Sequence, residues 1–228
     1  MDKSTISVFL AGDSTVATNY EATFPQTGWG QMLYKFIKGP VIIKNHAING
    51  RSTKSFIDEG RLNIISKEIK TGDFLFIQFG HNDEKDASER HTDPNTSFKD
   101  NLRLFINVAK DVGATPVLIS PVTRRTFDSD EKIINTHLVY CLAIADLAKD
   151  LNIAYIDLFK KSKILLEELG DEKSKELFLW LNPGEYQNFI SGITDNTHFT
   201  SKGAYKIAKL IVEGIKEENL VPLCDMLV

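Results

Sequence analysis

Five short apolar runs alternate along this chain with longer segments of helical spacing, and this alternation limits the fold more than any other feature. Apolar runs of about four to eight residues bounded by turn residues are typical of buried strands, whereas an apolar spacing of three to four residues is typical of helices. Strands that alternate with helices predict an α/β fold, a parallel sheet with helices on both faces. We expect strands at residues 7–11, 41–46, 74–79, 115–120 and 153–156.

The segments between these runs predict the covering helices. Right-handed crossovers leave few orders for five parallel strands, and 2-1-3-4-5 is a common one. In that order the first strand lies between the second and the third, so the loops that leave these three strands meet at one edge. The non-periodic stretch 180–197 is too long for a simple connector, which indicates a functional loop. We expect helices at residues 31–37, 57–69, 96–112, 131–151, 158–169, 172–179 and 201–215.

Composition indicates one globular domain over residues 1–228. The chain is 42 % hydrophobic and 25 % charged with a net charge of −4, which excludes a disordered chain and is not basic enough for nucleic-acid binding. No apolar run is long enough for a membrane span.

Cys141 and Cys224 lack metal-type spacing, and we expect neither a metal nor another cofactor. Residues 1–5 lack the features of a secretion signal, so we expect a cytoplasmic protein unless a signal peptide was removed. The oligomeric state is left open.

The first apolar run stops abruptly at Gly12-Asp13-Ser14, which places Ser14 on a turn at the carboxyl end of a strand. In open α/β sheets this edge is where ligands bind, so Ser14 is well placed to be a nucleophile. A short motif of this kind also occurs by chance. The alternative is that Asp13 or Ser14 caps the next helix.

A serine nucleophile needs a base and a third group that orients the base. His198 is the best candidate base because Asp195 precedes it by three residues, just before the last expected helix. One loop then supplies both the base and the carboxylate that fixes its tautomer. The alternative is an aspartate in a turn with a surface histidine, in which case Asp157 or Asp83 would be the next orienters to test.

Acyl transfer also needs donors for the oxyanion. The peptide N–H of Gly50 suits this role, because a residue without a side chain lets the backbone approach a substrate closely. Asn82 offers a side-chain amide, and the N–H of Ser14 is the third candidate. Taken singly, Gly50 and Asn82 fit ordinary turn residues at strand ends. Their joint placement at one predicted edge favours catalysis.

Four short motifs resemble, in order and spacing, the blocks of the SGNH (GDSL-type) hydrolases, over nearly the whole chain. The motifs are Gly12-Asp13-Ser14, Gly50, Gly80-His81-Asn82-Asp83 and Asp195-x-x-His198. The resemblance implies a flavodoxin-like three-layer α/β/α sandwich. It also implies a triad of Ser14, Asp195 and His198 and an oxyanion hole of Ser14, Gly50 and Asn82.

Within this family the sequence looks most like the rhamnogalacturonan acetylesterases, and it does not depart from them at the catalytic positions. The implied function is a serine esterase that removes O-acetyl groups from carbohydrate, on an acetylated oligosaccharide or a small acetyl ester. Arg124 and Arg125 are weighed as contacts for a sugar carboxylate, but we expect both to be solvated, as loop charges usually are. The other expected substrate contacts are Arg51, His81, Trp180 and Tyr186.

Other functions remain open at this stage. A lipase or thioesterase would need a large apolar tunnel, whereas the loops here are polar or charged; a xylan or other sugar deacetylase needs only a different sugar. A noncatalytic sugar-binding module would not need aligned Ser, His and Asp residues. A metal-dependent hydrolase would need ligands, for which His81, Asp83, Asp195 and His198 are the candidates.

Overall fold

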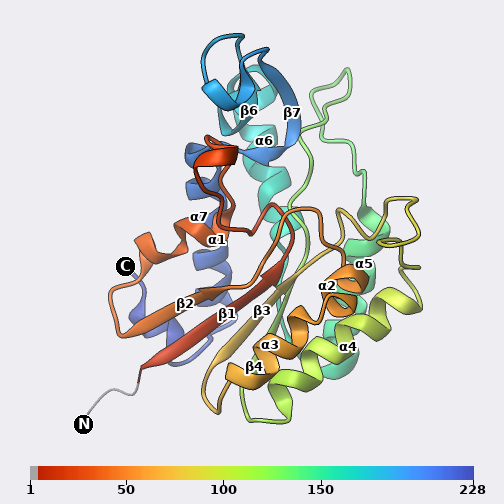
Figure 1. Cartoon of the computed structure of the whole chain (residues 1–228), viewed down its shortest axis with the longest axis vertical. Helices are drawn as coiled ribbons and strands as arrows, with labels where there is room; N and C mark the ends of the chain where they lie inside the picture. The colour runs from red at the N-terminus through yellow and green to blue at the C-terminus, as the bar shows by residue number, and fades with distance from the viewer. Residues whose placement is uncertain (1–4) are drawn as a thin grey trace.

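The computed structural model describes residues 5–228 of the chain. Its centre is a five-stranded parallel sheet in the order β2-β1-β3-β4-β5, as the sequence predicts (Figure 1). Residues 1–4, part of the segment on which the secretion-signal prediction rests, lie outside this range. The sheet strands are β1 Ile6–Gly12, β2 Val41–Asn45, β3 Phe74–Gln78, β4 Thr115–Ile119 and β5 Ala154–Ile156.

Alternate residues of the strands face two different helical layers. Phe9 and Leu75 belong to a buried cluster with α2, α3, α4 and α5, whereas Val8 and Phe76 belong to a second cluster with α1, α6 and α7. The period of two along a strand therefore separates two hydrophobic cores, one on each face of the sheet (Figure 1). The helices are α1 Trp29–Met32, α2 Thr53–Asp58, α3 Arg61–Glu68, α4 Ser97–Lys110, α5 Leu138–Leu151, α6 Leu158–Ser174 and α7 Ser201–Glu217.

Three of the expected helices differ from the observed ones. The segment expected at 131–151 becomes helical only at Leu138, because the Asp128 side chain accepts the N–H groups of Asp130 and Lys132 and holds a turn there. The segment expected at 57–69 is split into α2 and α3 by Gly60, whose φ of +71° ends the first helix. The segment expected at 31–37 is α1 followed by a 3₁₀ turn.

A two-stranded antiparallel hairpin stands beyond the carboxyl ends of the sheet strands, at the top of Figure 1. It consists of β6 Phe178–Leu181 and β7 Ile193–Phe199. The structure corrects the non-periodic stretch expected at 180–197. The helix expected at 172–179 is confirmed only in part, because residues 172–174 belong to α6, residues 175–177 form a 3₁₀ turn and β6 starts at Phe178. Phe178 and Phe199 pack together with ring centroids 5.3 Å apart and join the core cluster on the α7 side. Burial of these rings stabilises the hairpin on the sheet.

The remaining observations concern the membrane, the two cysteines and the apolar C-terminal tail, residues 220–228. No helix within residues 5–228 is long and apolar enough to cross a membrane. Cys141 is buried in α5 and Cys224 is half-buried, and both are free thiols. Leu223 and Met226 are buried in the cluster on the α7 side, so the apolar tail packs on the core.

Candidate active site

Ser14 lies on a turn directly after β1. The carbonyl of Asp13 accepts the N–H groups of Val16 and Ala17, at 3.1 and 3.0 Å. A Cβ at Gly12 would lie 2.9 Å from the carbonyl oxygen of Gln78, so only glycine fits this step without movement. The next helix starts fifteen residues later, at Trp29. The helix-cap alternative is therefore wrong.

The side chains of Ser14, His198 and Asp195 form one chain of hydrogen bonds. His198 Nε2 lies 2.8 Å from Ser14 Oγ, and His198 Nδ1 lies 2.6 Å from Asp195 Oδ2. The carboxylate accepts a hydrogen bond from Nδ1–H, so the neutral ring carries its proton on Nδ1 and Nε2 is free to accept the serine hydroxyl proton. Two residues of β7 thus meet the end of β1 in the arrangement that activates a serine.

Asp195 is held by its own backbone as well as by His198. Its Oδ1 accepts the N–H groups of Thr197 and His198, at 2.7 and 3.0 Å. Burial works against ionisation of Asp195, but the hydrogen bonds and charge of His198 and the two backbone donors outweigh it, so the pKa of this carboxyl lies below its usual range. The carboxylate is therefore ionised at neutral pH.

Gly50 and Asn82 lie in neighbouring loops that flank the end of β1. Ile48 donates its N–H to the carbonyl of Gly12 at 3.2 Å, which ties the Gly50 loop to the nucleophile turn. Gly50 has a φ of +79°, where glycine is favoured. The Asn82 Nδ2 group donates to the carbonyl of Arg51 at 3.1 Å, and a second N–H of the same amide stays available.

His81 is turned into the protein and not toward a substrate. It is 4 % exposed. Its Nδ1 lies 3.1 Å from Asp13 Oδ2 and its Nε2 lies 2.8 Å from the carbonyl oxygen of Val122. Because both ring nitrogens have protein partners, the structure corrects the expectation that His81 contacts substrate. Sequence reasoning missed the partner, Asp13, although its place beside Ser14 was a signal.

Asp83 is a second buried carboxyl in this region. Its Oδ1 accepts the hydroxyl protons of Thr53 and Thr92 and the N–H of Thr53. Burial raises the pKa of Asp83 to about 7, because its neutral hydrogen-bond donors only partly offset the loss of water. The nearby charge of Asp13 also raises this pKa. Within residues 5–228 no three His, Cys, Asp or Glu side chains group as metal ligands.

The three arginines considered as sugar contacts have protein partners. Arg51 pairs with Glu59 through Nε and Nη2, at 3.1 and 2.9 Å. Arg124 pairs with Glu84 at 2.5 Å. Arg125 is buried, which corrects the expectation that it is solvated. Its guanidinium donates to side chains or carbonyls of Ser174, Asn196 and Asp171 and so ties the hairpin to α6.

Trp180 and Tyr186 line one groove of about 460 Å³ beside the start of α7. Thr200 and Ser201, which follow His198 closely, line it too. Trp180 Nε1 donates to Asn196 Oδ1 at 2.9 Å, so the indole N–H is already satisfied. Tyr186 packs edge-on against Phe24 with ring centroids 5.6 Å apart. The hairpin and the loop at Phe24 therefore form an aromatic wall of this groove, which none of Ser14, Asp195 and His198 lines.

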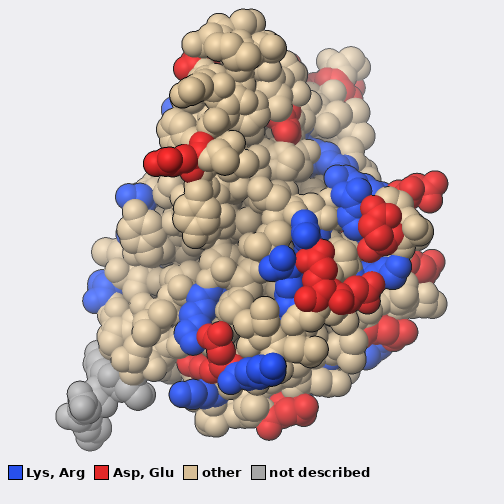
Figure 2. Space-filling model, in the orientation of Figure 1, with Lys and Arg blue, Asp and Glu red and all other residues tan. Residues whose placement is uncertain are grey.

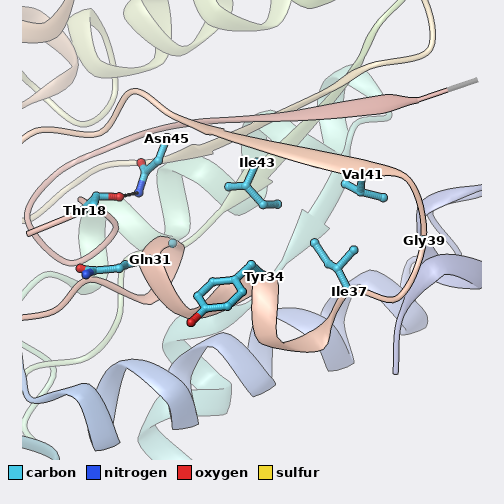
Figure 3. Close-up of a pocket in the computed structure, with 9 residues that line it drawn as sticks. Thr18, Gln31, Tyr34, Ile37, Gly39, Val41, Ile43 and Asn45 are labelled. Carbon is cyan, nitrogen blue, oxygen red and sulfur yellow. Dashed lines mark hydrogen bonds between the residues drawn. The ribbon is translucent and has the colours of Figure 1, made fainter.

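A second groove of about 460 Å³ runs along the edge strand β2 (Figure 3). Tyr34 and Ile43 line its apolar part, and Thr18 and Asn45, joined by a 3.1 Å hydrogen bond, line its polar end. None of Ser14, Asp195 and His198 lines this groove.

Charged side chains of both signs are interspersed over the lower part of the face in Figure 2. The hairpin end of the same face, at the top of the view, is mostly uncharged. On this face the two signs alternate and do not form a continuous positive stripe.

Comparisons with known proteins agree with this geometry. The family model described as GDSL-like lipase/acylhydrolase matches residues 8–211. The chain is 47 % identical over 228 residues to the rhamnogalacturonan acetylesterase RhgT of Bacillus subtilis (strain 168), covering all of this chain and 97 % of that protein. It is 41 % identical over 222 residues to the probable rhamnogalacturonan acetylesterase YesY of the same organism, covering 97 % of each.

Two solved structures share the fold. The YxiM protein of Bacillus subtilis matches with a TM-score of 0.81 at 28 % identity, over 96 % of this chain and 58 % of that chain. Axe2, an acetylxylan esterase from Geobacillus stearothermophilus, matches with a TM-score of 0.67 at 15 % identity, over 92 % of this chain and 94 % of that chain. The second likeness concerns the fold alone.

Proposed function

Because this chain belongs to the GDSL-like lipase/acylhydrolase family and is a carboxylic ester hydrolase, we propose that it removes O-acetyl groups from carbohydrate. The proposed substrates are acetylated rhamnogalacturonan oligosaccharides. The relatives with 47 and 41 % identity over nearly full length, both named for that activity, support this substrate class. The proposed cytoplasmic location would be tested by fractionating cells that make the protein.

The single observation that carries the proposed mechanism is the hydrogen-bonded chain from Ser14 through His198 to Asp195. Ser14 Oγ attacks the acetyl carbonyl carbon while its proton passes to His198 Nε2. The imidazolium then gives that proton to the sugar oxygen as the ester C–O bond breaks. A water molecule, deprotonated by His198, attacks the acetyl-enzyme and releases acetate. Asp195 stabilises the imidazolium in both halves of the reaction.

The proposed oxyanion hole consists of the N–H groups of Ser14 and Gly50 and the side chain of Asn82. The link from Asn82 to the carbonyl of Arg51 supports this assignment, because it holds the amide beside the Gly50 loop. Donors fixed in advance stabilise the negative charge that develops in the transition state without a reorganisation cost.

The groove lined by Trp180 and Tyr186 is the proposed site for further sugar residues of the substrate. Aromatic rings suit the apolar faces of sugars, and Asn182 and Lys202, which line the same groove, offer polar groups for hydroxyls or carboxylates. Arg51, next to Gly50, is a further proposed contact.

Release of acetate from a panel of acetylated pectic, xylan and simple sugar esters tests the substrate class. We expect the fastest release from rhamnogalacturonan oligosaccharides, and faster release from xylan would overturn this choice of sugar. Ser14→Ala should lower kcat by at least ~10³-fold. Ser66→Ala, which removes an exposed hydroxyl on α3, is the matched control and should retain the wild-type rate. Full activity of Ser14→Ala would overturn the serine mechanism.

A further inference from the structure

Two buried side chains next to the proposed catalytic residues bind each other. Asp13 directly precedes Ser14, and His81 directly precedes Asn82. Asp13 Oδ2 and His81 Nδ1 are 3.1 Å apart, and their side chains are 0 and 5 % exposed. One contact therefore joins the turn that carries the nucleophile to the loop that carries an oxyanion donor.

Asp13 also ends a buried chain of hydrogen bonds whose direction is fixed. Trp29 Nε1, which only donates, contacts Gln78 Oε1 at 2.7 Å. Gln78 Nε2 must then donate to Thr15 Oγ1, at 2.6 Å. The Thr15 hydroxyl, which has one proton, donates its hydrogen bond to Asp13 Oδ1 at 2.7 Å. The Thr15 N–H donates to the same oxygen at 2.9 Å. Oδ1 thus receives two donors, and Oδ2 faces His81.

The partners of His81 determine its protons. The carbonyl oxygen of Val122 cannot donate, so Nε2, 2.8 Å away, must carry a proton. Burial opposes the charge on Asp13, but the charge and hydrogen bond of His81 and the two donors of Thr15 hold the pKa of Asp13 below its usual range. Nδ1, the other ring nitrogen of His81, faces Asp13 Oδ2 at 3.1 Å.

We propose that His81, hydrogen-bonded to Asp13 through Nδ1, acts as a positioning residue for ester hydrolysis. The pair holds the Ser14 turn and the Asn82 loop in one fixed relation and anchors both to the loop at Val122. This inference rests on the proposed function, in which Ser14 attacks the ester and Asn82 binds the oxyanion.

The other titratable and charged groups around His81 are either uncharged or paired with other residues. The ring of His137 lies 4.8 Å away, and burial, with the charges of His81 and Arg124, lowers the pKa of His137 to about 2. Arg124, whose Nη2 lies 3.5 Å from the His81 carbonyl oxygen, is neutralised by Glu84. Asp83 bonds to neutral donors. Asp13 is therefore the carboxylate that the His81 ring contacts.

Two substitutions separate the two contacts of His81. His81→Asn keeps a donor at the position of Nδ1 for Asp13, whereas His81→Gln keeps one at the position of Nε2 for Val122 and leaves Asp13 unpaired. We expect His81→Gln to lower kcat by ~10²-fold with KM within ~3-fold, because small misplacements of reacting groups are costly. His81→Asn should retain kcat within ~10-fold of the wild type.

His137→Phe is the matched control, since His137 is an equally buried ring without a bond to Asp13. It should lower thermal stability and leave kcat within ~2-fold. Equal kcat losses in His81→Gln and His81→Asn would show a packing role only and overturn the proposal. Full activity of Ser14→Ala would instead overturn the proposed function, so the two failures are distinguishable.

Nitrogen NMR of the histidine rings in the wild-type protein tests the contacts of His81 without relying on a folded variant of His81. We expect a proton on Nε2, which faces the carbonyl oxygen of Val122, and a hydrogen bond between Nδ1 and Asp13. An Nε2 without a proton in the wild-type protein would overturn the proposal.

Discussion

Two aspartate–histidine pairs meet at the Ser14 turn, and they differ in almost every respect. Asp195 and His198 are three residues apart on β7, 2.6 Å from each other, with side chains 21 and 29 % exposed. Asp13 and His81 come from the ends of β1 and β3, are 3.1 Å apart and are almost fully buried. The first pair belongs to the projecting hairpin and the second to the sheet.

The second ring nitrogen accounts for the difference in chemistry. Nε2 of His198 faces the hydroxyl of Ser14, which can give up a proton. Nε2 of His81 faces the carbonyl of Val122, which can only accept a hydrogen bond. His198 is therefore free to take a proton from Ser14 during a reaction, whereas Nε2 of His81 faces no group that can give it one. An aspartate beside a histidine thus identifies a base only when the far nitrogen faces a proton donor.

The largest expected effect comes from Asp195→Asn. The amide N–H would point at Nδ1 of His198, so the ring would keep its proton on Nε2 and could not accept the proton of Ser14. We expect kcat to fall by ~10⁴-fold with little change in the melting temperature. Acetate release and thermal unfolding of the same sample measure the two effects.

A near-normal rate of Asp195→Asn would mean that Asp195 is not the orienting carboxylate. The structure offers no ready substitute among the two other aspartates considered. Asp157 caps the start of α6 through the N–H of Lys160, and Asp83 is bound by Thr53 and Thr92.

Asp13→Ala should have the next largest effect, and on stability. It leaves the hydroxyl proton of Thr15 and Nδ1 of His81 without their partner in the core, and removing one member of a buried pair costs about 3–5 kcal/mol. Urea unfolding of Asp13→Ala beside Asp13→Asn measures this. The amide can keep both hydrogen bonds, so we expect Asp13→Asn to retain most of the stability. Equal losses would contradict the donor pattern assigned to His81.

The sheet and the first half of the site are predictable because local signals suffice there. Each strand is an apolar run that ends in glycine or a polar residue, and parallel strands bring their carboxyl ends to one edge. Ser14, Gly50 and Asn82 therefore fall into place from the strand order alone. The orientation of His81 does not follow, because it depends on Val122, a partner in a loop forty-one residues away.

The hairpin was not predictable for a related reason. β6 is only four residues long, and β7 contains polar residues such as Asp195 and Asn196 that do not alternate with apolar ones. Its stability comes from distant contacts: Phe178 packs on Phe199, and buried Arg125 donates to Asn196. Nothing in the local pattern distinguishes that arginine from a solvated one.

Asp83 extends the comparison to a buried carboxyl without a cation. Folded Asp83 keeps its proton to a pKa of about 7, whereas the unfolded chain releases it near the ordinary value of 3.8. The folded state therefore binds more protons between these values, so this contribution to stability is complete below about pH 4 and is lost as the pH rises to about 7. From pH 5 to pH 8 it amounts to about 2–3 kcal/mol.

Urea unfolding at pH 5 and pH 8 tests this with Asp83→Asn. The variant should lack that part of the wild-type decline in the free energy of unfolding. Asp130→Asn, which changes an exposed aspartate, is the control and should keep the wild-type decline. A wild-type decline that persists in Asp83→Asn would place its source elsewhere.

The smallest expected effect concerns an exposed ion pair, Arg51 with Glu59, whose side chains are 33 and 35 % exposed. Water already solvates both charges, so Arg51→Gln should change the free energy of unfolding by less than about 1 kcal/mol.

If Arg51 contacts the substrate as proposed, Arg51→Gln should raise KM about fivefold and leave kcat unchanged, which corresponds to the loss of one modest contact. Glu59→Gln removes the same ion pair, and a second exposed pair with Arg61, but keeps Arg51. Its loss of stability should therefore be at least as large as that of Arg51→Gln, and its KM should match the wild type. An equal rise of KM in both variants would assign the effect to the shape of the Gly50 loop rather than to a contact with the sugar.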